Sequence, residues 1–230
     1  MTARCDWCLF GKGATMEIRS SIEVRWFVDD ASAEAKAARA WFRDVAPQSK
    51  REDHYLLTGR NDVGFKARVE EGLPAKLETK FLLGSLGPAL LHERFVGHIE
   101  RWRKLSLTAT DPELEANGKW LRLTKTRRLR KLAYEDGVVR PVDVVDNPAA
   151  GCGVEMTELA FEIDGTSQRA ITVGLDAFGP ESMLLEVLLR TCTVAFESSA
   201  SLELGFAQSE SYPTWLARTA SKLSSSPRGP

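Results

Sequence analysis

The chain has 230 residues, of which 43% are hydrophobic, so it is long and apolar enough for one large domain or two small ones. Its 31 Lys and Arg residues are balanced by 32 Asp and Glu residues, and the resulting net charge of -1 argues against a general nucleic-acid binder. No apolar run approaches the length of a membrane span, so no membrane partner is expected.

The N-terminal segment, residues 1–15, precedes the first strand-like segment, and we interpret it as an upstream start or a disordered arm. It contains Cys5 and Cys8 in a Cys-x-x-Cys spacing, but no second pair of thiols or histidines could complete a zinc site. The other two cysteines, Cys152 and Cys192, are isolated in the sequence. We therefore expect a cytoplasmic protein with reduced thiols.

The first half of the chain alternates between strand and turn signals. Residues 17–28 predict a strand, and Ser32 is one of several N-cap candidates for a helix over residues 31–45, which ends before Pro47. Further strands are expected at 54–58, 63–70, 76–83 and 95–108. The segment 84–91 is rich in Gly and Pro and predicts a short helix or a loop, and 111–118 predicts a loop.

The second half of the chain continues the pattern and then turns helical. Strands are expected at 119–132, 153–164 and 169–178, with a short run at Val138, a loop over 141–152 and a hairpin turn at Asp164-Gly165. A helix is expected over 181–196, a short strand near 202–206 and a short helix at 211–216. We expect 221–230 to be a disordered tail and 16–220 to be a single domain.

Four segments mix charged and apolar residues in an unusual way: 22–26, 65–69, 77–81 and 121–127. In the first three, alternation assigns the charged side chains to one face of a strand and mostly apolar ones to the other. The fourth is less regular, because Lys125 and Arg127 share a face with Leu121 and Leu123. If the sheet closed with the charged faces inward, it would form a tunnel suited to a polyanion. The alternative is an ordinary antiparallel sheet with solvated faces.

Many strands joined by turns, with few helices, predict an antiparallel α+β domain built around one sheet or barrel. In order and spacing, residues 17–180 resemble the CYTH superfamily, the triphosphate tunnel metalloenzymes. Ser21-x-Glu23-x-Arg25 falls where that family has Glu-x-Glu-x-Lys. Paired basic residues match at Lys66-x-Arg68 and Lys125-x-Arg127, and the remaining matches are Lys80, Glu158 and Asp176.

The resemblance implies an eight-stranded antiparallel tunnel-like barrel with helices packed outside. It also implies phosphate-binding roles for Arg25, Lys66, Arg68, Lys80, Lys125 and Arg127. It implies Mg or Mn held by Glu23, Glu158 and Asp176, with Glu23 as the catalytic candidate. Alternation alone does not choose between Glu155 and Glu158.

The first motif departs from the family pattern, because Ser21 replaces a metal-binding glutamate and Arg25 replaces a lysine. Arg presents a planar fork, whereas Lys is a point charge. The first hypothesis is a metal-dependent hydrolase of an inorganic or organic triphosphate. The second is a degenerate tunnel that binds a polyphosphate or nucleotide as a sensor or partner module, and a weaker third is an adenylyl cyclase. The partner expected in each case is a triphosphate-bearing small molecule or nucleotide, and a homodimer stays open.

Overall fold

The computed structural model describes residues 15–48, 50–70, 73–109, 119–199 and 201–225. Residues 1–14, which include Cys5 and Cys8, and the predicted loop 111–118 lie outside the described residues. The strands are β1 (Met16–Asp29), β2 (Arg51–Leu56), β3 (Val63–Val69), β4 (Ala75–His92), β5 (Phe95–Ala109), β6 (Trp120–Glu135), β7 (Val138–Val142), β8 (Gly151–Ile163) and β9 (Thr166–Phe178). The helices are α1 (Ala33–Trp41), α2 (Leu184–Glu197) and α3 (Tyr212–Ser225), with short 3-10 turns at Glu181–Met183 and Phe206–Gln208.

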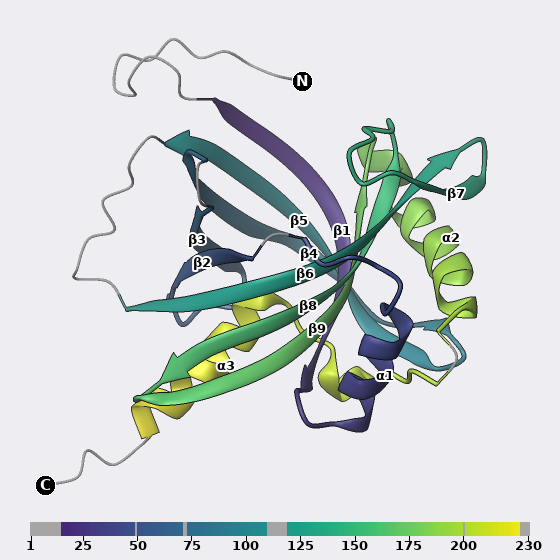
Figure 1. Ribbon diagram of the computed structural model, residues 1–230. Coiled ribbons are helices and arrows are strands. Elements are labelled where there is room, and N and C mark those ends of the chain that lie inside the picture. Colours follow the sequence, from purple (N-terminus) through teal and green to yellow (C-terminus); the bar gives the residue numbers. More distant parts are fainter. Residues whose placement is uncertain (1–14, 49, 71–72, 110–118, 200, 226–230) are drawn as a thin grey trace, which may run out of the picture.

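The sheet closes into a barrel of eight antiparallel strands, which confirms the predicted fold class (Figure 1). The strand order is β2-β3-β4-β5-β1-β9-β8-β6, and pairing of β6 with β2 completes the ring. Long β6 makes this possible, because its first half pairs with β2 while the stretch from Thr124 to Ala133 pairs with β8. Its last residues pair with β7, which lies outside the ring.

The main hydrophobic core lies outside the barrel wall, between the wall and helices α1 and α2. Alternate residues of β1, β8 and β9 point outward into this core, among them Trp26, Met156 and Val173. Helix α2 covers them with its own apolar stripe, which includes Val187 and Phe196. Because strand side chains alternate, this outward apolar face leaves the opposite face of each strand pointing into the barrel.

A second, smaller cluster fills one end of the barrel interior. Leu121 and Leu123 of β6 meet Phe27 of β1 and two apolar residues of α3, Trp215 and Leu216. The Trp215 and Phe27 rings stack with their centroids 4.9 Å apart. Helix α3 therefore closes this end of the barrel with apolar side chains.

Helix α1 is shorter than the sequence predicted. Ser32 is its N-cap, and the Ser32 hydroxyl accepts a hydrogen bond from the Ala35 N–H at 3.1 Å. The helix ends at Trp41, after which the chain turns, and the Val45 N–H donates to the Phe42 carbonyl. The predicted residues 43–45 thus belong to a turn.

The prediction of a short helix or loop over 84–91 was wrong, because this segment continues β4 opposite β5. Register irregularities occur next to Gly84 and Gly87, Gly87 adopts a φ of 81°, and Pro88 lies opposite His98. Bulges tolerate both residue types within a strand. The hairpin turn is confirmed, with positive φ at Asp164 and Gly165.

The C-terminal part differs from expectation in two places. Near 202–206 only an isolated bridge forms, between Leu204 and Phe95. Helix α3 is longer than the expected 211–216 and extends to Ser225, within the segment predicted as a tail, while 226–230 lie outside the described residues.

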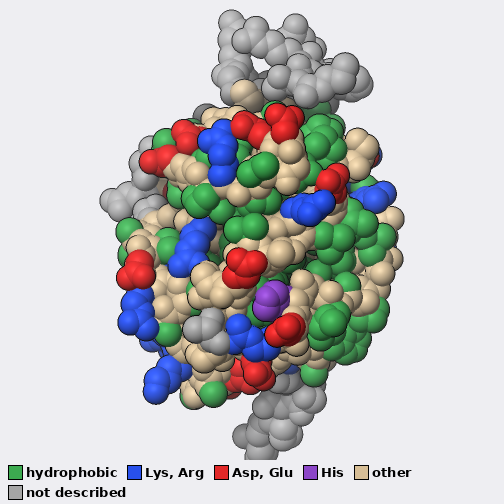
Figure 2. All heavy atoms as spheres, turned by 90° about the vertical axis from the view of Figure 1, so that its right-hand side faces the viewer, with side chains coloured by type: hydrophobic (Ala, Val, Ile, Leu, Met, Phe, Trp, Pro, Cys, Tyr) green, Lys and Arg blue, Asp and Glu red, His purple; other side chains and the backbone are tan. Residues whose placement is uncertain are grey.

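The outer surface near α2 mixes hydrophobic and charged side chains. Figure 2 views the molecule from that side and shows hydrophobic groups exposed among Lys, Arg, Asp and Glu. Leu185, Leu189 and Val194 of α2 are each more than a third exposed. Within the described residues, no helix combines the length and apolar character that crossing a bilayer requires.

Candidate functional site

A cavity of about 220 Å³ lies inside the barrel, and every strand of the eight-stranded ring contributes to its lining. The inward positions follow strict alternation, odd-numbered on β1, β2, β6 and β8 and even-numbered on β3, β4, β5 and β9. The start of α3 also contributes, through Ser211, Tyr212 and Pro213. This cavity is the interior expected if the charged faces of the sheet turn inward.

Positive charge dominates the lining of the cavity. The Lys and Arg residues number nine and the Asp and Glu residues four. A low-dielectric wall strengthens the field of such a set, and an excess of cations in a cleft favours anions. The cations are Arg19, Arg25, Arg51, Lys66, Arg68, Lys80, Lys104, Lys125 and Arg127, and the acids are Glu23, Glu78, Glu155 and Asp176.

Asp53 of β2 is the counter-ion at the centre of the basic cluster. Its side chain is 0% exposed, and its carboxylate lies 2.9 Å from Lys125 Nζ, 3.1 Å from Lys66 Nζ and 3.3 Å from Arg68 Nε. Burial raises the pKa of Asp53, but these cations outweigh burial and hold that pKa well below its usual value. Asp53 is therefore a carboxylate that binds cations of the wall.

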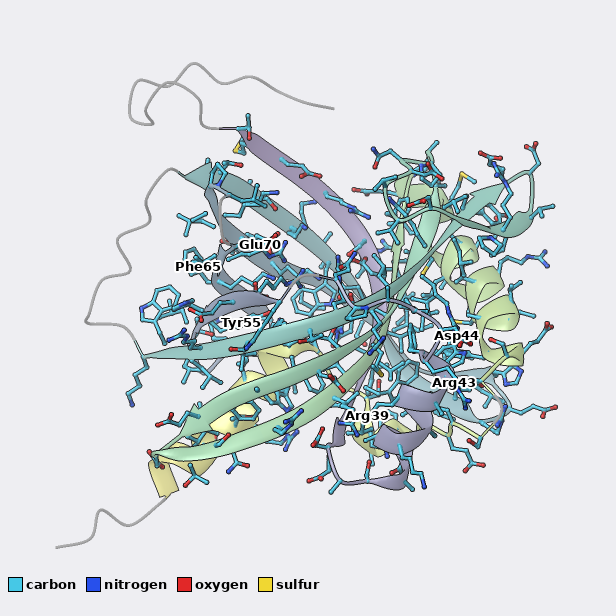
Figure 3. All side chains as sticks on the ribbon, viewed as in Figure 1. Arg39, Arg43, Asp44, Tyr55, Phe65 and Glu70 are labelled. Atoms are coloured by element: carbon cyan, nitrogen blue, oxygen red, sulfur yellow. The ribbon has the colours of Figure 1, made fainter. Side chains whose placement is uncertain are left out.

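The two buried lysines beside Asp53 have lowered pKa values. Burial lowers the pKa of Lys66 to about 7 and that of Lys125 to about 8, although Asp53 acts in the opposite direction. Lys125 also donates to the Tyr55 hydroxyl at 2.7 Å and lies 4.0 Å from the centre of the Tyr212 ring. Tyr55 can be located on β2 in Figure 3. A second anion in the cavity would stabilise the charged form of both lysines.

Glu78 of β4 has three basic neighbours across β3 and β5. Its carboxylate lies 2.8 Å from Lys66 Nζ, 3.1 Å from Arg68 Nη2 and 3.3 Å from Lys104 Nζ. Burial opposes ionisation, but these charges hold the pKa of Glu78 far below its usual value. Glu78 therefore stays ionised as a second internal counter-ion.

Arg25 of β1 is held by a fork of contacts that a lysine could not make. Its Nη2 lies 2.7 Å from Glu155, its Nη1 donates to the Thr172 hydroxyl at 3.0 Å, and its guanidinium lies 4.9 Å from the centre of the Tyr212 ring. Gly174 makes room for it, because a Cβ there would come within 3 Å of the guanidinium. These contacts thus depend on the planar guanidinium of Arg25, where the CYTH resemblance leads one to expect a lysine.

Glu23 and Asp176 lie opposite each other on paired strands β1 and β9. Lys80 of β4 forms an ion pair with Glu23, and the Ser21 hydroxyl donates to the same Glu23 oxygen at 3.0 Å. Although burial opposes ionisation, Lys80 and Arg25 hold the pKa of Glu23 below its usual value. Burial and the Glu23 charge raise the pKa of Asp176, whose Oδ1 is buried without a hydrogen-bond partner.

The structure brings most of the predicted site residues together around the cavity and leaves one out. The residues that meet there are Glu23, Arg25, Lys66, Arg68, Lys80, Lys125, Arg127 and Asp176. Glu158 is not part of the lining, and its carboxylate instead lies 3.0 Å from Arg39. Figure 3 labels Arg39 on α1. The alternation left open between Glu155 and Glu158 resolves to Glu155, which also lies 3.4 Å from Arg127.

Sequence reasoning missed several residues of the cavity. Asp53 occupies an inward, odd-numbered position of β2, and Glu78 occupies an inward, even-numbered position of β4. Alternation could therefore have identified both residues once the register of β2 and β4 was known. No sequence pattern indicated that Tyr212 lines the cavity, because it belongs to a helix far along the chain. Its ring contacts that of Tyr55, with the ring centroids 5.6 Å apart.

Comparisons with known proteins give a structural likeness at low sequence identity. A scan against protein families finds no match, and a search of curated proteins finds none either. A search of solved structures finds HpAC1 from Hippeastrum, described as a putative adenylyl cyclase with a dominant triphosphatase activity. The two chains are 10% identical, with a TM-score of 0.39 and coverage of 87% of this chain and 96% of that chain. The closed antiparallel barrel seen in the strand pairing is itself the fold that the CYTH resemblance implied.

The divalent cation implied by the resemblance does not fit the donors found in this cavity. Of the three expected ligands, Glu158 points elsewhere and Glu23 already binds the Lys80 ammonium. The Asp176 Oδ1 atom is buried without a hydrogen-bond partner. Mg and Mn prefer several oxygen ligands, and among the described residues no group of three or more His, Cys, Asp or Glu side chains is arranged to hold a metal.

Proposed function

We propose that the barrel binds a triphosphate-bearing small molecule, such as tripolyphosphate or a nucleoside triphosphate. The observation that carries this proposal is the cavity lined by nine Lys and Arg residues against four Asp and Glu residues. Phosphate groups bind such sites through charge-assisted hydrogen bonds, which are stronger than neutral ones. A linear chain of phosphates carries several charges in a row, and it therefore suits a lining in which cations come from strands all around the ring.

The cations closest to solvent are the best candidates for direct phosphate contacts. The side chains of Arg127, Lys104 and Lys80 are 27%, 26% and 31% exposed, so each can reach a ligand while keeping an internal partner. Lys125, at 2% exposed, is committed to Asp53 and Tyr55 and would mainly add to the positive potential.

The test is calorimetric titration of tripolyphosphate into the protein, with pyrophosphate and sulfate as shorter anions. Arg127→Gln should weaken tripolyphosphate binding about tenfold or more, because one charge-assisted contact contributes about 1.5–3 kcal/mol. The matched control is Arg128→Gln on the same strand, since Arg128 points outside the barrel and donates to the Val45 carbonyl. Equal affinities of wild type and both variants, or no binding at all, would refute the proposal.

Hydrolysis of the bound triphosphate is a second candidate function. The observation that favours it is the position of Lys66 in the cavity lining, where burial lowers the pKa of its amine to about 7. An uncharged amine in the cavity can accept a proton from a water molecule that attacks a phosphoryl group. Phosphate release from tripolyphosphate and ATP, and cyclic AMP formation from ATP, should be measured for wild type and Lys66→Met. Release that Lys66→Met leaves unchanged would contradict this role.

A further inference from the structure

Resting on the proposed function, we propose that Lys80 serves as a built-in cation in the place where a divalent metal would bridge Glu23 and Asp176. The cavity then binds phosphate chains without any divalent metal. The barrel would thus be a metal-independent site for polyphosphate-type anions, in contrast to the metal-loaded site that the family resemblance implied.

The strand register brings the two carboxylates to one spot. Glu23 and Asp176 are direct partners on the antiparallel strands β1 and β9, so their side chains leave the same face of the sheet. Side chains in such a pair have Cβ atoms about 4.5–5.5 Å apart. Both residues line the cavity, and a cation between them would offset two negative charges.

Lys80 supplies that cation through its ion pair with Glu23, and its charge also acts on Asp176. It reaches from β4 past β5 to form its ion pair with Glu23 Oε1, the same oxygen that accepts the Ser21 hydroxyl hydrogen at 3.0 Å. A metal ion at this oxygen would have to displace the ammonium and would then lie beside its positive charge. The serine donates a hydrogen to Glu23, whereas a carboxylate in its place would offer oxygens to a metal.

The other carboxylates inside the barrel also have basic partners. Glu155 lies 2.7 Å from Arg25 and 3.4 Å from Arg127. Glu78 and Asp53 each have at least three basic nitrogens within 4 Å. No spare acidic pair therefore remains among the described lining residues to recruit a metal elsewhere in the cavity.

The experiment uses the full chain, Lys80→Gln, Lys80→Met and the matched control Lys104→Gln, which removes another lining lysine that pairs with Glu78 instead of Glu23. Mn²⁺ is titrated by calorimetry and by its electron paramagnetic resonance signal, without any phosphate compound. Tripolyphosphate is titrated separately in EDTA and at fixed free Mg²⁺. Circular dichroism and thermal melting check that each variant is folded.

We expect wild type to bind tripolyphosphate within threefold equally in EDTA and in Mg²⁺, and to bind Mn²⁺ weakly. Both Lys80 variants should bind Mn²⁺ at least tenfold more tightly than wild type, whereas Lys104→Gln should not. Loss of wild-type tripolyphosphate binding in EDTA, or folded Lys80 variants without increased Mn²⁺ affinity, would overturn the inference. If no protein binds tripolyphosphate under any condition, the proposed function fails, and the Mn²⁺ titrations still decide the role of Lys80. If neither Lys80 variant folds, the EDTA comparison on wild type still tests whether tripolyphosphate binding needs a divalent metal, and loss of binding in EDTA would overturn the inference.

Discussion

Asp53→Asn offers a direct test of how the basic wall is held together. The substitution keeps the shape of a fully buried side chain but removes the charge that faces Lys125, Lys66 and Arg68 at 2.9 to 3.3 Å. Breaking a buried ion pair by removing one partner costs about 3–5 kcal/mol, because the remaining charges stay buried without compensation. We therefore expect the free energy of unfolding to fall by about 3–5 kcal/mol at pH 7.

The neighbouring residue Glu52 provides the matched control. Glu52 lies on the same strand as Asp53, but its side chain points to the opposite face of the sheet. It is 25% exposed and pairs with Arg122, whose side chain is 69% exposed. A solvent-exposed pair contributes about 0.2–1 kcal/mol, so Glu52→Gln should change stability by no more than that. Urea unfolding followed by tryptophan fluorescence measures both variants against wild type.

The effect of Asp53→Asn on the free energy of unfolding should also depend on pH. The pKa of Asp53 in the folded protein lies well below its value in the unfolded chain, so its stabilisation is present above about pH 4 and is lost as the pH falls toward the folded pKa. The gap between wild type and Asp53→Asn should therefore narrow in acid. Equal destabilisation by both variants at pH 7, or a gap that widens in acid, would refute the reasoning.

Three further predictions concern the cavity. Arg127→Ala should lower tripolyphosphate affinity about tenfold or more in calorimetry while shifting the melting temperature little, because its side chain is 27% exposed; a large melting shift with unchanged affinity would contradict this. The affinity for sulfate should fall as the pH rises from 6 to 9, because Lys66 and Lys125 have pKa values of about 7 and about 8 and lose their charge in this range, whereas the charge of sulfate is constant. A sulfate affinity that does not change with pH would contradict the lowered pKa values of the two lysines. Ser21→Glu should strengthen Mn²⁺ binding in calorimetry by adding a carboxylate beside Glu23, and an unchanged affinity would show that this strand cannot be made into a metal site.

Much of the barrel could be predicted because alternation in the sequence separates the apolar face of each strand from its charged face. The strand boundaries of β1, β3, β5 and β9 follow the predicted ranges closely. The irregularity of β6 has a simple cause, since Leu121, Leu123, Lys125 and Arg127 all point inward and the interior changes from apolar to charged along the strand. A pattern that looked inconsistent as a sheet face is therefore consistent within a barrel.

Three features of the barrel and its cavity could not be predicted without the tertiary structure. Alternation could not choose between Glu155 and Glu158, because the register of β8 against β6 and β9 fixes the parity. The glycines and the proline of 84–91 predict a short helix or a loop. The segment instead continues β4, with register irregularities next to Gly84 and Gly87 that only the opposing strand β5 defines. Tyr212 enters the cavity from α3, and no local pattern links it to β2 or β6.

The absence of a side chain at Gly174 has a consequence for variation in this barrel. The Arg25 guanidinium fills the volume that a Cβ at 174 would need, and it is fixed there by Glu155 and Thr172. The identities of positions 25 and 174 are therefore coupled: a larger residue at 174 requires a slimmer cation at 25, and a lysine at 25 leaves a gap that a larger residue at 174 would fill. Gly174→Ala and Arg25→Lys should each impair the protein alone and partly rescue one another together, so that the two sites vary as a pair.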